Sequence, residues 1–328
     1  MPTTRAKRIQ AIVDLGNADI NVLYRLPDDS DYWQREQFQS VVSTSTLVEN
    51  HPARIVLNDT NYLIGVDATA VQCDHTGQTD SGKVANALPL TVYALLKAVG
   101  VGQPLAVDLI FTCPSVKAYG ADIQAQLIGK HKLTLPPDEF ALIDSQTQTI
   151  QVASAIPQLE GYQAYRLVKA DCPNGAIMVD IGSRTILVTV VDAMGRILNR
   201  FAKDDCGCHR IVERVYQSEC LIGIQGMDIR LPNAQQVMTF LLGKAKKTVK
   251  QQQAGRIQAH VLACVQDTRT FVQQYGDKPV YLLGGGALLP GMVDIFSNGQ
   301  QQARIMPDAT WATLLGLSKV ADRLFTQA

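Results

Sequence analysis

The sequence has none of the features that mark nucleic-acid-binding, secreted or membrane-spanning proteins. Its 328 residues include 30 basic and 30 acidic side chains, so no net charge attracts the surface as a whole to nucleic acid or to an anionic membrane. No run of 18 apolar residues occurs, and no apolar segment follows the basic residues of the N-terminus as it would in a signal peptide. We therefore expect a cytoplasmic protein that has no transmembrane segment and makes no direct contact with nucleic acid.

A framework of disulfide bonds is also absent. The seven cysteines are an odd number, and they are scattered along the chain rather than paired. The one cluster, Cys206-Gly207-Cys208-His209, has no second pair of ligands nearby at the spacing of a zinc site. This pattern predicts reduced cysteines without a bound metal, as is usual in a reducing cytoplasm.

What the sequence does contain is the composition and patterning of an α/β protein. Hydrophobic residues make up 46% of the chain and charged residues 18%, and the length suits two domains of about 150 residues each. Short β-branched runs alternate with segments of helical periodicity in both halves, which is typical of α/β folds. The expected helices are residues 88–99, 116–128 and 161–169, one from 204–207 to Glu219, 228–242, 244–275 with an interruption at Gly255, 288–296 and a final amphipathic helix. The expected strands include 105–112, 280–283 and two in the region that starts at residue 140, the second of which passes residue 154 and ends at Ala155-Ile156-Pro157. A hairpin turn is expected at 58–61 and a mobile polar loop at 72–83.

One pattern occurs twice, about half a chain apart. In residues 177–195 an apolar run reaches Asp180, breaks at a Gly-Ser pair and then resumes, which predicts a strand, a tight turn and a second strand. Residues 13–22 align with residues 179–188 and keep Val-Asp, Gly, Ile and Val in register, with Asp14 and Asp180 166 residues apart. The repeat predicts two related halves, each opening on a β-hairpin with an acid at its tip.

The acid and the glycine at each tip suit a polyphosphate ligand. Gly16 and Gly182 allow the backbone to approach a phosphate and to direct N–H donors at it. Asp14 and Asp180 would repel a phosphate unless a divalent cation lay between them, so a Mg²⁺ ion held through water is the natural mediator. If the two halves face each other across a cleft, the tips would hold the phosphates from opposite sides.

A third glycine-rich stretch follows an expected strand. Gly284-Gly285-Gly286 comes directly after the apolar residues 280–283, and a backbone without side chains allows close approach to an adenosine or an α-phosphate. Each signal alone is weak, because an Asp-x-Gly turn or a triple glycine is commonly no more than a turn. It is their joint occurrence in this order that favours a nucleotide site.

These residues resemble those of a known fold family. A hairpin repeated half a chain apart, a strand that runs into three glycines and a small-residue helix near the C-terminus are similar to the actin-like ATPase fold, in which two related α/β domains surround a nucleotide cleft. Over nearly its whole length, at the level of motifs, the chain resembles the bacterial actin-like proteins of the ParM/StbA plasmid-segregation group. Asp14 to Val22 is similar to phosphate loop 1, Asp180 to Val188 to phosphate loop 2, Gly284 to Ala287 to the adenosine motif and residues 310–317 to the second connecting helix. Residues 112–114, 156–157 and 203–212 are also similar to ParM-type segments, the last of them to the one that opens the helix near the nucleoside.

The resemblance implies a domain plan. Actin-like domain I is expected at residues 1–165, with residues 30–100 as a small β-rich subdomain and a C-terminal helix at 311–328 that packs back onto it. Actin-like domain II is expected at residues 166–310, with residues 205–265 as its smaller subdomain.

The resemblance also implies a function and a set of site residues. It implies an ATPase that binds ATP (or GTP) with Mg²⁺, polymerises head to tail into filaments and segregates plasmid DNA through a ParR-like DNA-binding adaptor. Asp14 and Asp180 are the expected metal-holding and catalytic acids, and Ser154 is a further catalytic candidate. The expected nucleotide contacts are Gly16, Asn17, Asn21, Gly182, Ser183, Arg184, Thr185, Gly207, Gly284, Gly285, Gly286 and Ala287.

Several positions depart from the family pattern. Many relatives carry a phosphate-contacting Lys in phosphate loop 1, where this chain has Asn21, and ParM-like proteins usually have small residues and a further Asp in phosphate loop 2, where it has Arg184 and Leu187. The acid thought to orient the attacking water aligns with Ser154. Arg184 is either a replacement cation, since a guanidinium suits a γ-phosphate, or a surface residue at the tip of a hairpin. A general base typically accelerates such a reaction about 10²–10⁴-fold. Because Ser154 stands where that acid is expected, we expect nucleotide binding with slow hydrolysis.

Other functions on the same fold stay open. One is a chromosomally encoded filament that shapes or organises the cell, with slow or lost hydrolysis. A non-polymerising sugar or acetate kinase would need a general base for the acceptor hydroxyl and larger insertions than residues 30–100 offer. A chaperone relative would need a substrate-binding domain after residue 328, and we expect none. A nucleotide-binding scaffold without activity is the last alternative.

Overall fold

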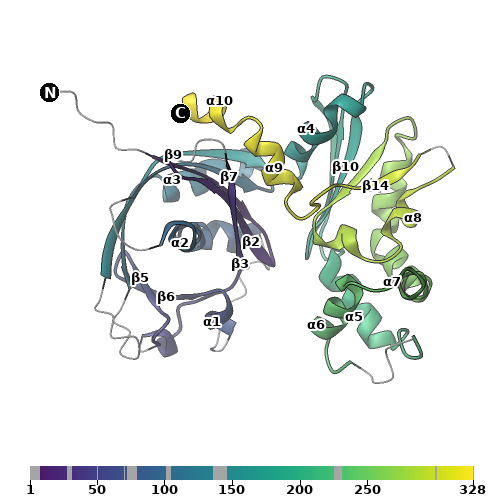
Figure 1. Ribbon diagram of the computed structural model, residues 1–328, viewed down its shortest axis with the longest axis horizontal. Coiled ribbons are helices and arrows are strands. Elements are labelled where there is room, and N and C mark those ends of the chain that lie inside the picture. The colour runs from purple at the N-terminus through teal and green to yellow at the C-terminus, as the bar shows by residue number, and fades with distance from the viewer. Residues whose placement is uncertain are drawn as a thin grey trace. The chain divides into compact units, whose positions relative to one another are not determined.

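The structure is a computed structural model that describes residues 8–27, 32–49, 51–69, 71, 80–100, 105–135, 146–224, 231–299 and 301–327. The chain divides into two units (Figure 1): unit 1 contains residues 1–160 and 317–328, and unit 2 contains residues 161–316. Each unit has its own β-sheet and its own buried apolar core. None of the described helices is long and apolar enough to cross a membrane.

Unit 1 is built on a sheet that curves around one helix. Its described strands number nine, in the order β3-β2-β1-β7-β9-β8-β5-β6-β4, and β1, β7 and β9 run parallel. Figure 1 shows helix α2 (Asp80–Val99) inside the curve of the sheet, where Leu90, Ala94 and Leu95 are buried. The strands are β1 Ile9–Leu15, β2 Asp19–Arg25, β3 Gln34–Gln39, β4 Val42–Ser43, β5 Ile55–Leu57, β6 Thr60–Ile64, β7 Leu105–Cys113, β8 Gly129–Leu135 and β9 Gln146–Leu159.

The other helices of unit 1 are short. Helix α3 (Ala121–Leu127) follows a π-helical turn at Val116–Gly120, so residues 116–127 are helical, as predicted. Helix α10 (Ala321–Thr326) belongs to unit 1, where Asp322 forms an ion pair with Arg25 of β2. Helix α1 (Val66–Thr69) and the 3₁₀ turn η1 (Thr46–Val48) follow β6 and β4.

Unit 2 is built on a smaller sheet. Its described strands number five, in the order β12-β11-β10-β13-β14. The long helix α7 (Lys247–Gln273) directs Ile257, Val261 and Val265 into the core beneath the sheet. The strands are β10 Ala176–Ile181, β11 Ile186–Val191, β12 Ile197–Lys203, β13 Val280–Leu283 and β14 Ala303–Ile305. The other helices are α4 Tyr165–Val168, α5 Cys208–Ser218, α6 Ala234–Leu242 and α8 Met292–Phe296, with 3₁₀ turns η4 Tyr162–Ala164, η5 Lys169–Asp171 and η6 Gly285–Leu288. Helix α9 (Ala312–Ser318) begins in unit 2 and ends in unit 1.

Both sheets contain the same arrangement of five strands. β3-β2-β1-β7-β9 and β12-β11-β10-β13-β14 each consist of three antiparallel strands followed by two strands parallel to the third. The two hairpins also share their register, because Asp14 lies opposite Asn21 and Asp180 lies opposite Leu187. The repeat predicted from the sequence is therefore confirmed at the level of strand order and pairing.

Strand β9 runs further than predicted. We expected it to end by Pro157, but it continues to Leu159. Strand β8 pairs with β9 only as far as Val152, so Pro157 lies where β9 has a neighbour on one side. An edge position of this kind tolerates a residue that has no backbone N–H. The longer strand places Glu160 at the end of the sheet.

Some helix boundaries also differ from the predictions. Helix α2 begins at Asp80 rather than at Leu88, and α7 is continuous through Gly255, where a side chain would meet nothing within 4 Å. Residues 288–296 do not form one helix, because Pro290 and Gly291 separate η6 from α8. The C-terminal segment forms two helices, α9 and α10, instead of one. The predicted segments 72–83, 140–154 and 228–242 each lie partly outside the described residues.

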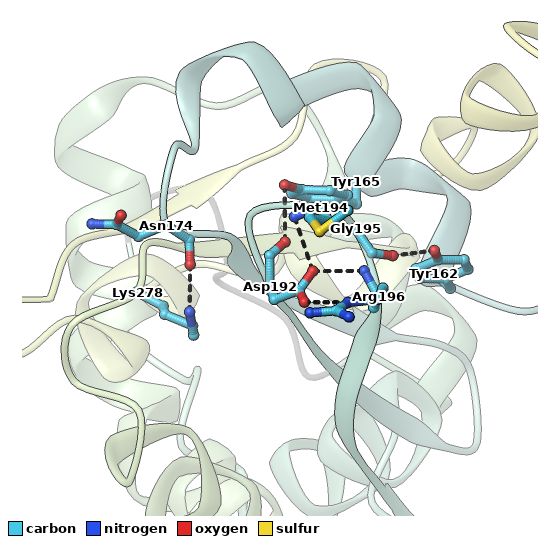
Figure 2. A network of polar contacts seen from close by, with 8 residues as sticks. All are labelled: Tyr162, Tyr165, Asn174, Asp192, Met194, Gly195, Arg196 and Lys278. Carbon is cyan, nitrogen blue, oxygen red and sulfur yellow. Dashed lines mark hydrogen bonds and ion pairs between the residues drawn. The ribbon is translucent and has the colours of Figure 1, made fainter.

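A polar network fixes unit 2 at the end of its strands away from the acid of the hairpin. Figure 2 shows the Asp192 carboxylate accepting hydrogen bonds from two N–H groups of the β11–β12 turn (2.8 and 2.9 Å) and from the Arg196 guanidinium (2.7 Å). Tyr165 donates its hydroxyl to the carbonyl of Asp192 at 3.3 Å, and Tyr162 donates to the carbonyl of Gly195. The first residues of unit 2 are thereby attached to this turn.

Candidate functional site

The first hairpin places an acid at the carboxyl end of parallel strands. Asp14 of β1 accepts a hydrogen bond from the hydroxyl of Thr112 near the end of β7. It accepts another from the side chain of Asn21, which lies directly opposite on β2. Parallel strands end at one edge of a sheet, which is where α/β proteins bind their ligands. Two of the predicted site residues, Asp14 and Asn21, are thus in contact, with Thr112 as a partner that the sequence did not single out.

Two buried charges lie at the same edge. The ammonium of Lys83, on α2, is 2.7 Å from a carboxylate oxygen of Glu160, which follows β9, and their side chains are 7% and 13% exposed. Burial, and then the negative charge of Glu160, raise the pKa of Asp14 to about 6. The two hydrogen bonds to Asp14 and the positive charge of Lys83 oppose this rise without cancelling it. The ionised form of Asp14 is therefore disfavoured in the free protein, and a bound cation would relieve this. We call Asp14, Asn21, Lys83, Thr112 and Glu160 the Asp14 cluster.

The turn between β1 and β2 requires its glycine. The N–H of Gly16 donates to the carbonyl of Asp14 at 2.9 Å. A Cβ atom on Gly16 would lie 2.3 Å from the carbonyl oxygen of Asp19, so no other residue fits without a rearrangement of the turn. Asn17 follows in the same turn and is partly exposed. Gly16 and Asn17 therefore form a surface turn next to Asp14.

Ser154 lies elsewhere on the same strands. Its hydroxyl donates to the carboxylate of Asp108 at 2.8 Å, and Asp108 also forms an ion pair with Arg8 at 3.2 Å. Along β9, Ser154 comes four residues before the position opposite Thr112, which corresponds to roughly 13 Å. The structure does not bring Ser154 to the Asp14 cluster, and its catalytic role stays a prediction.

Sequence reasoning missed Lys83 and Glu160 for two reasons. Lys83 belongs to the polar stretch 72–83, which we interpreted as a loop, whereas α2 begins at Asp80. Glu160 follows Pro157, where β9 was expected to end. A charged residue directly after the last apolar residue of a strand is a signal that could have found Glu160, but no such signal marks Lys83.

In unit 2, Asp180 occupies the corresponding position on β10. A Cβ atom on Gly284 would lie 2.5 Å from one carboxylate oxygen of Asp180, and a Cβ atom on Gly161 would lie 3.0 Å from the other. Both glycines have positive φ, 79° and 72°, a conformation that other residues rarely adopt. The carboxylate therefore lies against bare backbone on two sides, at the end of the strand.

The turn after β10 packs onto the N-terminus of α5. The carbonyl oxygens of Gly182, Ser183 and Arg184 accept hydrogen bonds of 2.8–3.1 Å from the N–H groups of residues 206–209. Gly207 has no room for a side chain, because a Cβ atom would lie 2.5 Å from the Ser183 oxygen. Gly207, a predicted nucleotide contact, is therefore required for the packing of this turn.

This packing also sets the direction of the N–H groups of the turn. The C=O and N–H of a trans peptide point in opposite directions, and no described peptide bond is cis. The N–H groups of Ser183, Arg184 and Thr185 therefore point away from α5, and they donate no hydrogen bond to any described residue. Successive N–H groups of this kind form a concavity that binds anions such as phosphate.

The side chains of the same turn are polar and accessible. Arg184 forms an ion pair with Asp205 at 2.9 Å, with the two side chains 37% and 70% exposed. Thr185 donates its hydroxyl to Asp204 at 3.2 Å. Ion pairs on the surface contribute little to stability, so Arg184 can exchange its carboxylate for a phosphate at little cost. Leu187, by contrast, is buried in the sheet and offers no polar group.

The three glycines after β13 are not equivalent. Gly284 packs against Asp180, and a Cβ atom on Gly286 would lie 2.3 Å from the side chain of Ile181, so both are explained by packing on β10. A Cβ atom on Gly285 would meet nothing within 4 Å. Ala287 is buried. Of the predicted adenosine motif, Gly285 is therefore the residue whose missing side chain the packing of unit 2 does not explain.

The acids of the two hairpins suit Mg²⁺ only in company with a phosphate ligand. Among the described residues, no three His, Cys, Asp or Glu side chains lie close enough together to hold a metal ion. Mg²⁺ typically binds through one or two carboxylates and keeps several waters and the phosphate oxygens of its substrate. Asp14 in unit 1 and Asp180 in unit 2 each offer a carboxylate of this kind, and the unfavourable ionised state of Asp14 is consistent with a cation beside it.

Comparison with known proteins identifies the fold. No family model matches the chain, and no characterised protein matches it by sequence. Solved structures do match: the ADP complex of Ta0583, an archaeal actin homolog, is 16% identical with a TM-score of 0.66, over 96% of this chain and 99% of that one. Bacillus thuringiensis ParM with ADP is 11% identical with a TM-score of 0.65, over 98% and 100%. The actin-like protein Alp7A is 14% identical with a TM-score of 0.65, over 97% of each chain. This chain therefore has the actin-like ATPase fold that its motifs resemble.

Proposed function

We propose that this protein binds ATP with Mg²⁺ and polymerises into actin-like filaments. The observation that carries the proposal is the turn at 182–185, where three successive N–H groups point away from α5 and have no partner among the described residues. The fold supports it, because two of the similar structures, those of Ta0583 and ParM, contain ADP. GTP in place of ATP is the alternative nucleotide.

The proposed roles follow from the chemistry of each group. The N–H groups of Ser183 to Thr185 donate to phosphate oxygens, and Arg184 adds a positive charge when it leaves Asp205. Asp14 and Asp180 hold Mg²⁺ through its water ligands, and the ion, when bound, neutralises charge on the phosphates. Gly285 leaves space for the nucleoside. Gly16 and Gly182 allow the two turns to approach the phosphates closely.

We propose that the protein binds ATP but hydrolyses it slowly. Ser154 bonds to Asp108 and lies away from the Asp14 cluster, while Glu160, the acid at the end of β9, is paired with Lys83. A carboxylate held in an ion pair is a weaker acceptor for the proton of a water molecule, so hydrolysis has to wait until Glu160 is released from Lys83. The protein is therefore proposed to be an ATPase of low turnover.

The proposed cellular role is plasmid segregation, in which a DNA-bound adaptor of the ParR type captures filament ends. A filament that organises the cell is the related alternative. A small adaptor gene beside this one, with a cluster of DNA repeats, would support segregation. The absence of both would favour the organising role.

Pelleting combined with electron microscopy tests the central proposal. Purified protein is incubated with ATP, ADP, a non-hydrolysable ATP analogue or no nucleotide, each with Mg²⁺. We expect filaments with ATP and with the analogue, and binding of fluorescent ATP that requires Mg²⁺. If the protein binds ATP but forms filaments under none of these conditions, the proposed polymerisation is refuted. If it neither binds ATP nor forms filaments, the whole proposal is refuted.

A further inference from the structure

We propose that Lys83 is the cation that contacts phosphate in unit 1, and that this contact releases Glu160 from its ion pair. The inference rests on the proposed function and assigns the phosphate-binding charge of the first hairpin to a different element, helix α2. It gives Lys83 and Glu160 a shared role that changes when nucleotide binds.

The first hairpin cannot supply this charge itself. Residues 14–21 contain the acids Asp14 and Asp19 and no basic residue. Arg25 lies opposite Gln10 at the other end of the hairpin, and Arg8 is paired with Asp108 there. A polyphosphate that approaches this turn would therefore meet negative charge unless a cation came from outside the hairpin.

Lys83 is held at this edge in spite of an unfavourable position. Its side chain is 7% exposed, and burial of an ammonium is costly. It also lies in the first turn of α2, where the helix dipole disfavours a positive charge. The carboxylates of Glu160 and Asp14 compensate for both effects in the free protein. A buried cation placed at the N-terminal end of a helix is well suited to an anion that shares the same site.

A second observation at this edge also indicates a ligand. Asn21 is 8% exposed, and its Oδ1 atom is buried without a hydrogen-bond partner, while its amide group donates to Asp14. Buried side-chain oxygens are almost always satisfied in folded proteins. A water on Mg²⁺, or the ammonium of Lys83 in a new position, would provide the missing donor. The cluster is therefore incomplete as the free protein presents it.

The charges of the cluster explain why Lys83 would exchange Glu160 for a phosphate. With all groups ionised, Asp14, Glu160 and Lys83 carry a net charge of −1. A phosphate with its Mg²⁺ brings both a cation for Asp14 and a stronger anion for Lys83. As Lys83 turns to the phosphate, the carboxylate of Glu160 becomes free to accept a hydrogen bond from water. Phosphate binding and the availability of Glu160 are thereby coupled, and no covalent step is involved.

Binding of fluorescent ATP with Mg²⁺ to three variants tests the inference. Lys83→Met should weaken ATP binding about 10- to 100-fold, the effect of losing one charge-assisted hydrogen bond. Lys83→Arg, which keeps the charge, should recover part of the affinity. Glu160→Gln should bind ATP as tightly as wild type or more tightly, because Lys83 no longer has to leave a carboxylate. A merely structural ion pair would instead make the Lys83→Met and Glu160→Gln variants equally weak.

Controls separate folding from binding. The double variant K83M/E160Q removes both members of the ion pair, so Glu160 is not left as an unpaired charge, and it should fold even where Lys83→Met does not, yet still bind ATP weakly. Lys278→Met removes a lysine that donates to the carbonyl of Asn174, in unit 2, and should leave affinity unchanged (Figure 2). Wild-type affinity in K83M/E160Q or in folded Lys83→Met overturns this inference alone. Absence of ATP binding by the wild-type protein overturns the proposed function together with it.

Discussion

The acids at the two ends of the unit 2 strands are held in contrasting ways. Asp192 has its carboxylate saturated by three donors from the turn that it begins. Asp180 lies against the bare backbone of Gly161 and Gly284. The first arrangement stabilises the ionised carboxylate within the protein, whereas the second keeps a carboxylate at the end of the strand with little room for a neighbouring side chain. Asp192 is therefore expected to act on stability and Asp180 on ligand binding.

Replacement of Asp192 by Asn should lower stability in a pH-dependent way. Hydrogen bonds from the backbone and then the side chain of Arg196 lower the pKa of Asp192 below its ordinary value of 3.8. The stabilisation is therefore fully present above about pH 4 and is lost as the pH falls through the folded-state pKa. Asp192→Asn should lower the Tm at pH 7, and the difference from wild type should shrink towards pH 2. The exposed Asp277→Asn is the control, and a difference that does not depend on pH would contradict the prediction.

Replacement of Asp180 by Ala should abolish Mg²⁺-dependent nucleotide binding. The proposed metal loses its carboxylate in unit 2, while the glycines packed around that position keep their backbone conformation. Titration with fluorescent ATP, with Mg²⁺ and with a chelator, measures the loss, and the Tm checks that the fold is intact. Asp192→Asn should bind ATP like wild type. Unchanged affinity in Asp180→Ala would remove this residue from the site.

At the level of elements, the two hairpins share their strand pairing but differ in the groups that surround the acid. The acid lies opposite a polar residue in unit 1 and opposite an apolar one in unit 2, Asn21 and Leu187. In unit 1 the surrounding groups are side chains, the charged Lys83 of α2 and Glu160 after β9 and the neutral Thr112 of β7. In unit 2 they are backbone groups, set in direction by the packing of the turn onto α5. The two turns therefore offer a ligand different groups, side chains in unit 1 and backbone N–H groups in unit 2.

The glycines after β13 are expected to have different roles, Gly286 in packing and Gly285 in ligand contact. Gly286→Ala places a methyl group against Ile181 and should destabilise unit 2 by about 1–3 kcal/mol, the usual cost of overpacking a core. Gly285→Ala places its methyl group in open space, so it should leave the Tm unchanged and weaken ATP binding. Thermal unfolding and nucleotide titration of both variants check this. Wild-type affinity in a stable Gly285→Ala variant would show that the nucleoside does not approach Gly285.

The sequence was sufficient for elements defined by local patterns and insufficient for those completed by distant contacts. Both hairpins follow from alternating apolar residues around a Gly turn, and the strand before Gly284 follows from four apolar residues in a row. The end of β9 could not be predicted, because Pro157 is tolerated only through the absence of β8 beside it. The approach of Lys83 to Glu160, 77 residues away in the chain, depends on how α2 packs inside the sheet. The actin-like fold was therefore predictable, and the charged half of the Asp14 cluster was not.

At the scale of the whole molecule, the repeat and its divergence bear on how a filament would respond to nucleotide. Both units carry this hairpin beside their parallel strands, and the proposed nucleotide would contact the ends of those strands. If the proposed nucleotide stabilises one conformation of the chain, its hydrolysis would remove part of that stabilisation. Filament lifetime should therefore depend on the residue that promotes hydrolysis.

Filament lifetime can decide between the two candidates for that residue. Glu160 lies at the end of β9 in the Asp14 cluster, whereas Ser154 bonds to Asp108 further back along the strand. Glu160→Gln should therefore polymerise with ATP like wild type, release phosphate about 10²–10⁴-fold more slowly and form filaments that persist after polymerisation. Ser154→Ala should match wild type in all three respects. Light scattering over time measures polymerisation and filament persistence, and a phosphate-release assay on the same samples measures hydrolysis. Rapid release by Glu160→Gln together with slow release by Ser154→Ala would restore the catalytic role to Ser154.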